Sequence, residues 1–373
     1  MVKYECIHLT ILRFATQNMF NLFLSQDSCL TVDIGTTSIK ILELRGGKQA
    51  PRVLNYGMLE SSGYLARANQ ALQTSNLKIF EADIVELLKT LVREMGVQTK
   101  DVFASLPPFS VFTTILDFPA MSKKEVEKAM IYQARQYVPL PLSEVALDWM
   151  QIGEYQDDKG FAHQKIMLIS VPQEQIQKYQ RIFKAAGLRL KALELESLSV
   201  ARLFADDPTP TLIIDIGSRS TNIMFMENGR LTFNGQSDFG GASLTQALAS
   251  GLGINPLRAE ELKKEKGIIG TGANYELSTI MMPFLDAILN EVKKVQFVYQ
   301  QQMPMARKTE RVVLAGGGAN LLGLPEYFER EFQTPVVKAA PFLKFERLPE
   351  MEPFIPELNP MMAVGLGLGM KLK

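Results

Sequence analysis

Two short segments of the chain place a carboxylate, a glycine and hydroxyl side chains directly after apolar residues. In the later segment, Asp215 follows the apolar residues 212–214 and precedes Gly217 and the hydroxyls of Ser218, Ser220 and Thr221. The glycine lets the backbone bend beside a ligand, and successive N–H groups and hydroxyls can then donate to phosphate oxygens. A carboxylate here can face the metal ion that accompanies those phosphates. The segment therefore predicts a buried strand that opens into a phosphate-binding turn.

The same pattern occurs about half a chain earlier, where Asp33 follows residues 30–32 and precedes Gly35, Thr36, Thr37 and Ser38. Each copy continues into another strand-like segment and a tight-turn pair, Gly46-Gly47 or Asn228-Gly229, which indicates a hairpin. In a Walker loop or a dinucleotide fingerprint the glycines lead straight into a helix, and the chain has no G-x-x-x-x-G-K-[ST] motif. A single D-x-G-[ST] is usually an ordinary turn. Its recurrence in matching hairpins predicts a repeat at the scale of a domain.

A third segment, residues 311–320, reads as a strand that ends in Gly316, Gly317 and Gly318, with Pro325 placed to begin the next helix. Three glycines allow very close approach of the backbone to a ligand, although a flexible turn is the simpler interpretation. A turn between a buried strand and a helix is where α/β sheets bind ligands.

Together these segments resemble the phosphate 1, phosphate 2 and adenosine motifs of the actin, Hsp70 and sugar-kinase superfamily, in the same order along nearly the whole chain. The resemblance implies an α/β protein with a two-lobed actin-like ATPase fold, made of duplicated RNase H-like lobes that bind ATP and Mg²⁺ between them. It assigns the metal to Asp33 and Asp215. It assigns the nucleotide to Gly35, Thr36, Thr37, Ser38, Lys40, Gly217, Ser218, Arg219, Ser220, Gly240, Gly241, Glu260, Lys263, Gly316, Gly317, Gly318 and Asn320.

Three further segments bear on the predicted site, and two of them have simpler alternatives. Glu196 lies where an acidic residue orients the attacking water in several actin-like ATPases, but it fits a surface helix equally well. Residues 238–243 precede a helix whose first turn would offer free N–H groups to phosphate. Residues 259–263 lie in a helix that Asn255 and Pro256 should begin and Gly267 should end. They resemble the segment that borders the base and ribose, or they form an exposed charged helix.

The length of 373 residues predicts more than one compact unit, because single cores rarely exceed about 300 residues. Met19 is the expected natural start, within a partly disordered extension. The expected units are an extension (1–27), a first lobe (28–108), an inserted α+β subdomain (109–188), a return to the first lobe (189–208), a second lobe (209–355) and a C-terminal return to the first lobe (356–373).

Within the insertion, residues 111–118, 145–152 and 165–171 read as strands. Ser122 and Glu125 form a capping box that begins a helix, and Pro172 opens a second helix that Gly187 should end, so two helices are expected on a small sheet. Residues 117–122 (Asp-Phe-Pro-Ala-Met-Ser) and 137–145 (Tyr-Val-Pro-Leu-Pro-Leu-Ser-Glu-Val) resemble the inserted subdomain of the type IV pilus assembly protein PilM family. This signature is longer and more specific than the phosphate turns.

The PilM resemblance implies a cytoplasmic component of the type IV pilus inner-membrane platform, peripheral at the inner face of that membrane. It further implies docking of the short cytoplasmic tail of the membrane protein PilN, contacts with other platform proteins and motor ATPases, self-association, and at most slow ATP hydrolysis. A cell-division protein of the FtsA type is the main alternative. FtsA normally ends in an amphipathic membrane helix after a linker, whereas residues 369–373 show neither feature. A sugar or acetate kinase ranks last, because no acceptor site is visible.

The amino-acid composition and the charge pattern argue against several classes of protein. The 40 basic and 40 acidic residues cancel, so no global field favours nucleic acid or an anionic membrane. Two cysteines and two histidines without metal-ligand spacing argue against disulfide scaffolding and a zinc site, and they fit a reducing cytoplasm. Charged residues interrupt the apolar N-terminal stretches, which argues against a signal peptide. The apolar residues 361–370 are far shorter than the roughly 20 needed to span a bilayer. We therefore expect no transmembrane span.

Overall fold

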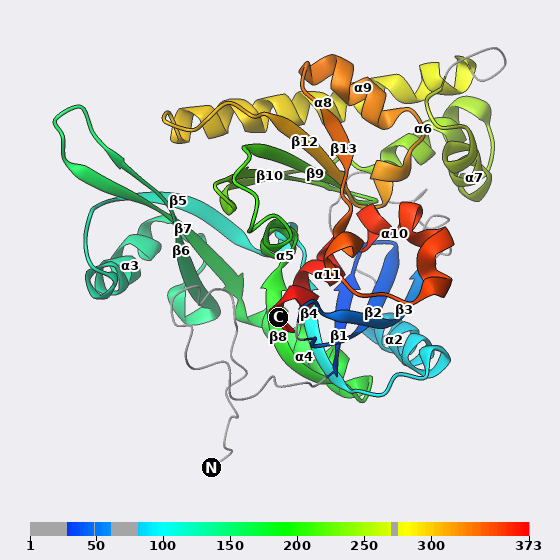
Figure 1. The fold of residues 1–373 in the computed structure, drawn as a ribbon, viewed down its shortest axis with the longest axis horizontal. Helices are drawn as coiled ribbons and strands as arrows, with labels where there is room; N and C mark the ends of the chain where they lie inside the picture. Colours follow the sequence, from blue (N-terminus) through cyan, green and yellow to red (C-terminus); the bar gives the residue numbers. More distant parts are fainter. Residues whose placement is uncertain (1–27, 48, 61–80, 270–274, 373) are drawn as a thin grey trace.

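The computed structural model of the chain describes residues 28–47, 49–60, 81–269 and 275–372 and contains two five-stranded sheets of equivalent order (Figure 1). The extension predicted for residues 1–27 lies outside the described residues. The first sheet, in the order β3-β2-β1-β4-β8, consists of β1 (Ser28–Ile34), β2 (Ser38–Arg45), β3 (Arg52–Glu60), β4 (Asp101–Leu106) and β8 (Arg189–Leu195). The second, in the order β11-β10-β9-β12-β13, consists of β9 (Thr211–Ile216), β10 (Thr221–Glu227), β11 (Arg230–Ser237), β12 (Arg311–Ala315) and β13 (Val336–Lys338).

The two sheets have the same connectivity and the same register at their first hairpin. In each, three antiparallel strands are followed by two parallel strands. Asp33 is the cross-strand partner of Lys40, and Asp215 is the partner of Asn222. The predicted domain-scale repeat is therefore confirmed in strand order, strand direction and register.

Helices cover the outer face of each sheet and also lie between the two sheets, so that helices and sheets alternate as layers (Figure 1). The first lobe's outer face carries α2 (Glu81–Met95) and α4 (Gln173–Ala185). Between the sheets lie α5 (Glu196–Arg202) and α11 (Ala363–Gly369). Beyond the second sheet lie α6 (Gly241–Leu252), α7 (Pro256–Lys266), α8 (Tyr275–Gln302) and α9 (Leu324–Phe332), and α10 (Ile355–Met361) precedes α11. The inner helices are thus the elements that both lobes share.

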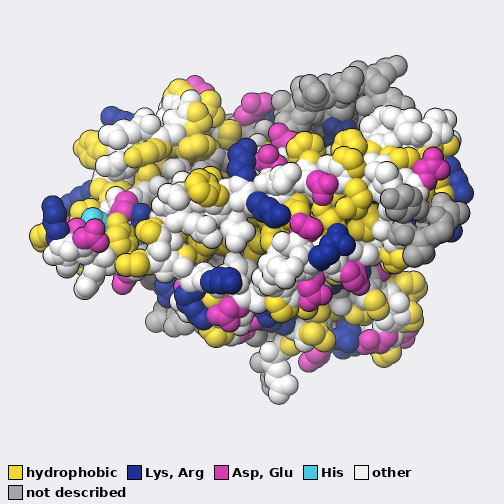
Figure 2. Space-filling view, turned by 90° about the horizontal axis from the view of Figure 1, so that it is seen from above, with side chains coloured by type: hydrophobic (Ala, Val, Ile, Leu, Met, Phe, Trp, Pro, Cys, Tyr) yellow, Lys and Arg dark blue, Asp and Glu magenta, His cyan; other side chains and the backbone are white. Residues whose placement is uncertain are grey.

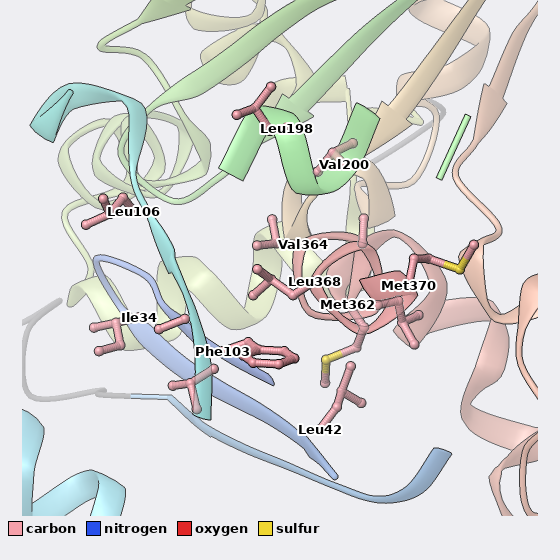
Figure 3. Close-up of a cluster of buried hydrophobic side chains, with 14 of the residues drawn as sticks. Ile34, Leu42, Phe103, Leu106, Leu198, Val200, Met362, Val364, Leu368 and Met370 are labelled. Atoms are coloured by element: carbon pink, nitrogen blue, oxygen red, sulfur yellow. The ribbon is translucent and has the colours of Figure 1, made fainter. Parts of the chain in front are cut away.

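The inner helices pack through a continuous apolar core (Figure 3). Leu198 of α5 and Leu368 of α11 belong to the same cluster as Leu42 of the first sheet. A Cβ on Gly367 would lie 1.9 Å from the carbonyl oxygen of Ser199, so only glycine allows α11 to approach α5 this closely. The glycines of α11 therefore allow this helix to pack closely against its neighbours.

The inserted subdomain is a three-stranded sheet, β5-β7-β6, formed by β5 (Phe112–Pro119), β6 (Val145–Gln156) and β7 (Ala162–Pro172), with α3 (Lys123–Tyr137) on one face. The capping box of Ser122 and Glu125 is present as predicted. Successive side chains of a strand point to opposite faces. Accordingly, Ile166 and Leu168 pack with α3, whereas Met167 and Ile169 join the core of the first lobe.

The second helix of the insertion does not cover the small sheet, which corrects the prediction. Helix α4 lies against α2 and β8, and its apolar face, which includes Ile176, Tyr179 and Phe183, belongs to the cluster that contains the core of the first sheet. Helical periodicity shows that one face of a segment is apolar, but it does not show which sheet that face covers.

The chain also returns to the first lobe earlier than the predicted boundary at residue 356. Phe342 and Phe345 are buried in the cluster that contains the core of the first sheet and the inner helices. The N–H of Glu346 donates to the carbonyl of Pro51 at 3.0 Å, and its carbonyl accepts from the N–H of Val53 at 2.8 Å. Residues 341–354 consist mainly of short 3-10 turns, which have no long periodic pattern for sequence reasoning to detect.

The surface carries no large field of one sign on the face seen in Figure 2, where acidic and basic side chains are interspersed. Across the described ranges, no helix has both the length and the apolar character needed to cross a membrane.

Candidate nucleotide-binding site

The two aspartate-containing turns have the same backbone geometry. The N–H of Gly35 donates to the carbonyl of Ser38 at 2.9 Å, and the N–H of Gly217 donates to the carbonyl of Ser220 at the same distance. A Cβ on either glycine would come within 3.1 Å of that carbonyl oxygen. Residues 35–38 and 217–220 are all half-buried, so both turns remain accessible to a ligand.

In the first lobe, Asp33 already has two side-chain partners. Lys40 Nζ lies 3.2 Å from Asp33 Oδ2, and Ser105 Oγ donates to Oδ1 at 3.1 Å. Burial would lower the pKa of Lys40, but Asp33, Asp215 and Glu196 outweigh burial and raise it. Lys40 is therefore protonated and interacts with carboxyl groups from both lobes.

In the second lobe, Asp215 is 9 % exposed and lies against the glycine segment. Burial is the main cause that raises its pKa to about 6; Asp33 also raises it, and Lys40 opposes the shift. Gly316 has φ 78°, and a Cβ there would lie 2.3 Å from Asp215 Oδ1. A Cβ on Gly317 would meet no described atom within 4 Å. The glycines thus allow the chain to pass directly over Asp215 and leave open space beside it.

Glu196 is the first residue of α5 and is half-buried. Burial first, and then Asp33 and Asp215, raise the pKa of Glu196 well above its usual range, with Lys40 opposing them. Ionisation of Glu196 is therefore disfavoured in the ligand-free protein. The structure brings Glu196 close enough to Asp33, Asp215 and Lys40 for these charges to interact.

Tyr179 of α4 is a neighbour of this cluster that sequence reasoning missed. It is buried, and burial together with the charges of Glu196 and Asp33 raises the pKa of its phenol. The sequence contains no signal for this, because the position of Tyr179 depends on the packing of α4 against the first lobe.

The start of α6 braces the second turn and does not present free N–H groups, which corrects another prediction. The N–H groups of Gly241 and Ala242 donate to the carbonyls of Gly217 and Ser218, at 2.9 and 2.7 Å. A Cβ on Gly240 would lie 2.7 Å from the Ser218 carbonyl oxygen, so glycine is required at this approach. The Thr221 hydroxyl is also engaged, because it donates to the carbonyl of Phe239 at 2.8 Å.

Glu260 and Lys263 are not an exposed charged pair. Lys263 Nζ donates to the carbonyl of Gly241 at 3.0 Å, to Thr245 Oγ1 at 2.8 Å and to Glu260 Oε2 at 2.6 Å. Thr245 donates to the same carboxylate. Burial opposes ionisation of Glu260, but Lys263, Thr245 and Lys264 outweigh it and lower its pKa. This network fixes α7 against the first turn of α6, next to the second phosphate turn.

Two predicted residues stand at the edges of the site. Arg219 is half-buried at the tip of the second turn, and burial lowers its pKa. The Asn320 side chain donates to the carbonyl of Glu357 at 2.9 Å, and Lys338 Nζ lies 3.4 Å from its Oδ1. Asn320 thus connects the glycine segment to α10.

The residues present fit a magnesium nucleotide better than a free metal ion. The described residues hold no cluster of three or more His, Cys, Asp or Glu side chains able to bind a metal. Mg²⁺ usually keeps several waters and binds through one or two carboxylates together with substrate phosphates. Asp33 and Asp215 could supply the carboxylates, and the two half-buried turns could supply donors to the phosphates. Two cavities of about 340 and 330 Å³ beside α2 are lined by other residues and are not part of this site.

The duplicated sheets, the shared inner helices and the facing aspartate turns define an actin-like ATPase fold. The chain belongs to the type IV pilus assembly protein PilM family, whose model matches residues 31–373. The fold and the PilM resemblance expected from the sequence are both confirmed.

Three solved structures illustrate this fold. A chain of a "PilM-PilN type IV pilus biogenesis complex" matches with a TM-score of 0.77 and 21% identity, over 93% of this chain and 99% of that chain. The ethanolamine utilization protein EutJ from Carboxydothermus hydrogenoformans matches with a TM-score of 0.52 and 17% identity, over 93% and 90%. MreB 5 of Spiroplasma citri bound to AMPPNP matches with a TM-score of 0.50 and 14% identity, over 91% and 94%.

Proposed function

We propose that the chain is a component of type IV pilus assembly that binds ATP with Mg²⁺ between its lobes and docks the cytoplasmic tail of a PilN-type membrane protein. The observation that carries the nucleotide assignment is the pair of equivalent turns, with Asp33 and Asp215 close enough to interact electrostatically with each other and with Lys40. Membership in the PilM family supports the assignment to type IV pilus assembly. The solved MreB 5 structure bound to AMPPNP supports the class of ligand.

In this proposal each lobe contributes one carboxylate and one phosphate turn. Asp33 and Asp215 hold the hydrated metal, while the turn N–H groups and Arg219 face the phosphates. The α6–α7 network of Glu260 and Lys263 and the open space at Gly317 border the base and ribose. Bound Mg²⁺ supplies positive charge that offsets the phosphates and both carboxylates. Because the ligand contacts both lobes, it favours the closed arrangement over an open one.

Hydrolysis is expected to be slow. Phosphoryl transfer needs a positioned water in addition to charge stabilisation, and Glu196 is the candidate that could orient it. The raised pKa of Glu196 means that its surroundings disfavour the ionised form, which is the form that would accept a proton from the water. ATP then acts chiefly as a ligand that sets the arrangement of the lobes. Rapid steady-state turnover by the purified protein alone would contradict this part of the proposal.

The partner site proposed here is the junction between the first lobe and the inserted subdomain. Phe109 lies at this junction, between β4 and β5, and is 41 % exposed. A solved relative of the same fold is described as a PilM–PilN complex, which supports a PilN-type tail as the occupant. This partner would hold the protein at the inner face of the inner membrane, in the cytoplasm.

Coupling between nucleotide and tail has a physical route. Tyr179 of α4 lies within electrostatic reach of Glu196 and Asp33, and the same helix packs near β7 of the inserted sheet. If ATP changes tail affinity by some factor, the tail must change ATP affinity by the same factor.

The test measures binding of a PilN tail peptide by fluorescence anisotropy, with and without Mg-ATP. Phe109→Ser should weaken the peptide about tenfold or more, because a well-packed aromatic anchor contributes about 2 kcal/mol. Phe354→Ser is the matched control, since Phe354 is also exposed, at 53 %, but lies on the C-terminal segment. Deleting residues 109–188 is a poor test, because it would remove α4 from the first lobe's core. Undiminished peptide binding by a folded Phe109→Ser variant would contradict the junction site.

A further inference from the structure

Asn222 of β10 is the most unusual buried polar residue in the described part of the chain. Its side chain is 5 % exposed, yet neither Nδ2 nor Oδ1 has a hydrogen-bond partner among the described residues. Leaving such a group unsatisfied costs about 1–3 kcal/mol, so an orphaned amide in a core needs an explanation. A ligand that arrives later is one such explanation.

The position of Asn222 connects it to the nucleotide site. Asn222 is the cross-strand partner of Asp215, so both side chains lie on the same face of the second sheet. Directly opposed residues of an antiparallel pair have Cβ atoms about 4.5–5.5 Å apart. Met224, two residues further along β10 and therefore on the same face, belongs to the core cluster that includes α5 and α11. Asn222 thus faces the space between the lobes, beside Asp215.

In the first lobe, the residue at the same register position has a side-chain partner. There the equivalent residue is Lys40, whose Nζ lies 3.2 Å from Asp33. In the second lobe an amide replaces the ammonium group, and it makes no equivalent contact with Asp215. A carboxamide offers both donors and an acceptor, so a bare cation could satisfy only its oxygen. A hydrated metal together with phosphate oxygens offers partners to both ends.

We propose that Asn222 is an additional ligand-contacting residue of the nucleotide site: Nδ2 donates to a phosphate oxygen, and Oδ1 accepts from a water held by Mg²⁺. The inference rests on the proposed ATP–Mg²⁺ function and adds to it a residue outside the D-x-G-[ST] turn. In this arrangement the ligand removes an unfavourable feature of the free protein. Part of the binding free energy then comes from satisfying Asn222.

A single substitution of Asn222 should therefore preserve or raise the stability of the free protein while it lowers the affinity for Mg-ATP. Asn222→Leu keeps a similar shape and removes the unsatisfied amide. Replacing an unpartnered buried polar group by an apolar one of similar size is neutral or stabilising for the free protein. The same change removes two ligand contacts, which should weaken Mg-ATP about tenfold or more. A purely structural role would instead lower the stability of the free protein and leave affinity unchanged.

The experiment measures thermal unfolding without nucleotide and Mg-ATP binding by calorimetry for the wild type, Asn222→Leu and Asn234→Leu. Asn234 is the matched control, because it pairs with Met224, lies on the same face and has an orphaned Oδ1, but sits one strand further from Asp215. We expect the melting temperature of Asn222→Leu to be unchanged or raised and its Mg-ATP affinity to fall at least tenfold. Asn234→Leu should bind Mg-ATP like the wild type.

Two outcomes separate this inference from the function on which it rests. If the wild type does not bind Mg-ATP, the proposed function fails. If the wild type binds and Asn222→Leu binds equally well, only the Asn222 inference is overturned. Asn222→Asp provides a second test should the leucine variant not fold. It adds a carboxylate beside Asp215, so ATP affinity should become more dependent on Mg²⁺; an unchanged Mg²⁺ dependence would contradict the inference.

Discussion

The two lobes share one topology and one turn geometry, yet their aspartates stand in different environments. Asp33 is hydrogen-bonded to Lys40 and Ser105. Asp215 lies beside an unpartnered amide and under Gly316, with its pKa raised to about 6. The same fold therefore supplies one half-site that is electrostatically satisfied without ligand and one that is not. The comparison indicates that the first lobe provides a fixed platform, which also carries the insertion, whereas the second lobe gains most from ligand binding.

The largest predicted effect is a difference in stability between equivalent substitutions. Asp33→Asn removes the carboxylate charge beside Lys40 and should lower the free energy of unfolding by about 3–5 kcal/mol, as expected when one partner of a buried ion pair is lost. Asp215→Asn replaces a carboxyl group that burial disfavours in its charged form, so the ligand-free protein should keep or gain stability. Urea unfolding of both variants measures the difference. Equal destabilisation by the two substitutions would show that the lobes are not distinguished in this way.

A pH series sharpens the same comparison. The pKa of Asp215 in the folded protein, about 6, lies above the value of about 3.9 for an unperturbed aspartate. A raised pKa means that protonation favours the folded state. This contribution is complete below about pH 4 and is lost as the pH rises through 6, and two pKa units correspond to about 3 kcal/mol.

The matching measurement is urea unfolding between pH 4 and 7.5 in the presence of a chelator. The stability of Asp215→Asn relative to the wild type should rise up to about pH 6.5 and then level off. A constant difference across this range would mean that Asp215 does not titrate where its environment predicts.

The segment after β12 provides a third test of the comparison between the lobes. Three glycines follow β12 in the second lobe, whereas Pro107 and Pro108 follow the equivalent strand β4 in the first lobe. Gly316→Ala places a Cβ against Asp215 at a positive φ and should destabilise the protein by about 2 kcal/mol. Gly317→Ala meets no described atom, so it should leave stability unchanged and weaken nucleotide binding if the ligand occupies that space. Thermal unfolding and calorimetry on the pair separate structure from binding. Normal affinity in Gly317→Ala would place the ligand elsewhere.

The smallest predicted effect concerns the bracing of α6 by α7. Lys263→Met removes the ammonium group shared by Glu260, Thr245 and the Gly241 carbonyl, and should cost about 1–2 kcal/mol of stability. Lys264→Met is the neighbouring control, since this more exposed lysine lies 3.9 Å from Glu260. Its effect should stay within about 0.5 kcal/mol. If Lys263→Met and Lys264→Met lower the stability equally in thermal unfolding, Lys263 does not brace α6 in the way proposed.

Local patterns in the sequence were sufficient to predict the repeat and the boundaries of many elements. The D-x-G-[ST] turns, the capping box at Ser122 and the Asn228-Gly229 hairpin each depend on a few neighbouring residues, and all appear in the structure. Positive φ at Asn228 and Gly229 is what this two-residue hairpin turn requires.

Features set by tertiary packing could not be predicted in the same way. The surface that α4 covers and the early return at Phe345 depend on contacts between distant segments. Asn222 was missed because only strand register places it beside Asp215. The first-turn N–H groups of α6 were expected to be free because a helix start is visible in sequence, whereas the carbonyls of Gly217 and Ser218 that occupy them are not.

The most direct test of the account is calorimetry of Mg-ATP binding to the double variant Asp33→Asn/Asp215→Asn, with folding verified by circular dichroism. Both substitutions keep side-chain size and remove the two carboxylate charges that would hold the hydrated metal. We predict that Mg-ATP affinity falls at least 100-fold, about 2.7 kcal/mol or more. A folded double variant that binds Mg-ATP with the affinity of the wild type would contradict the assignment of the nucleotide to the space between the lobes.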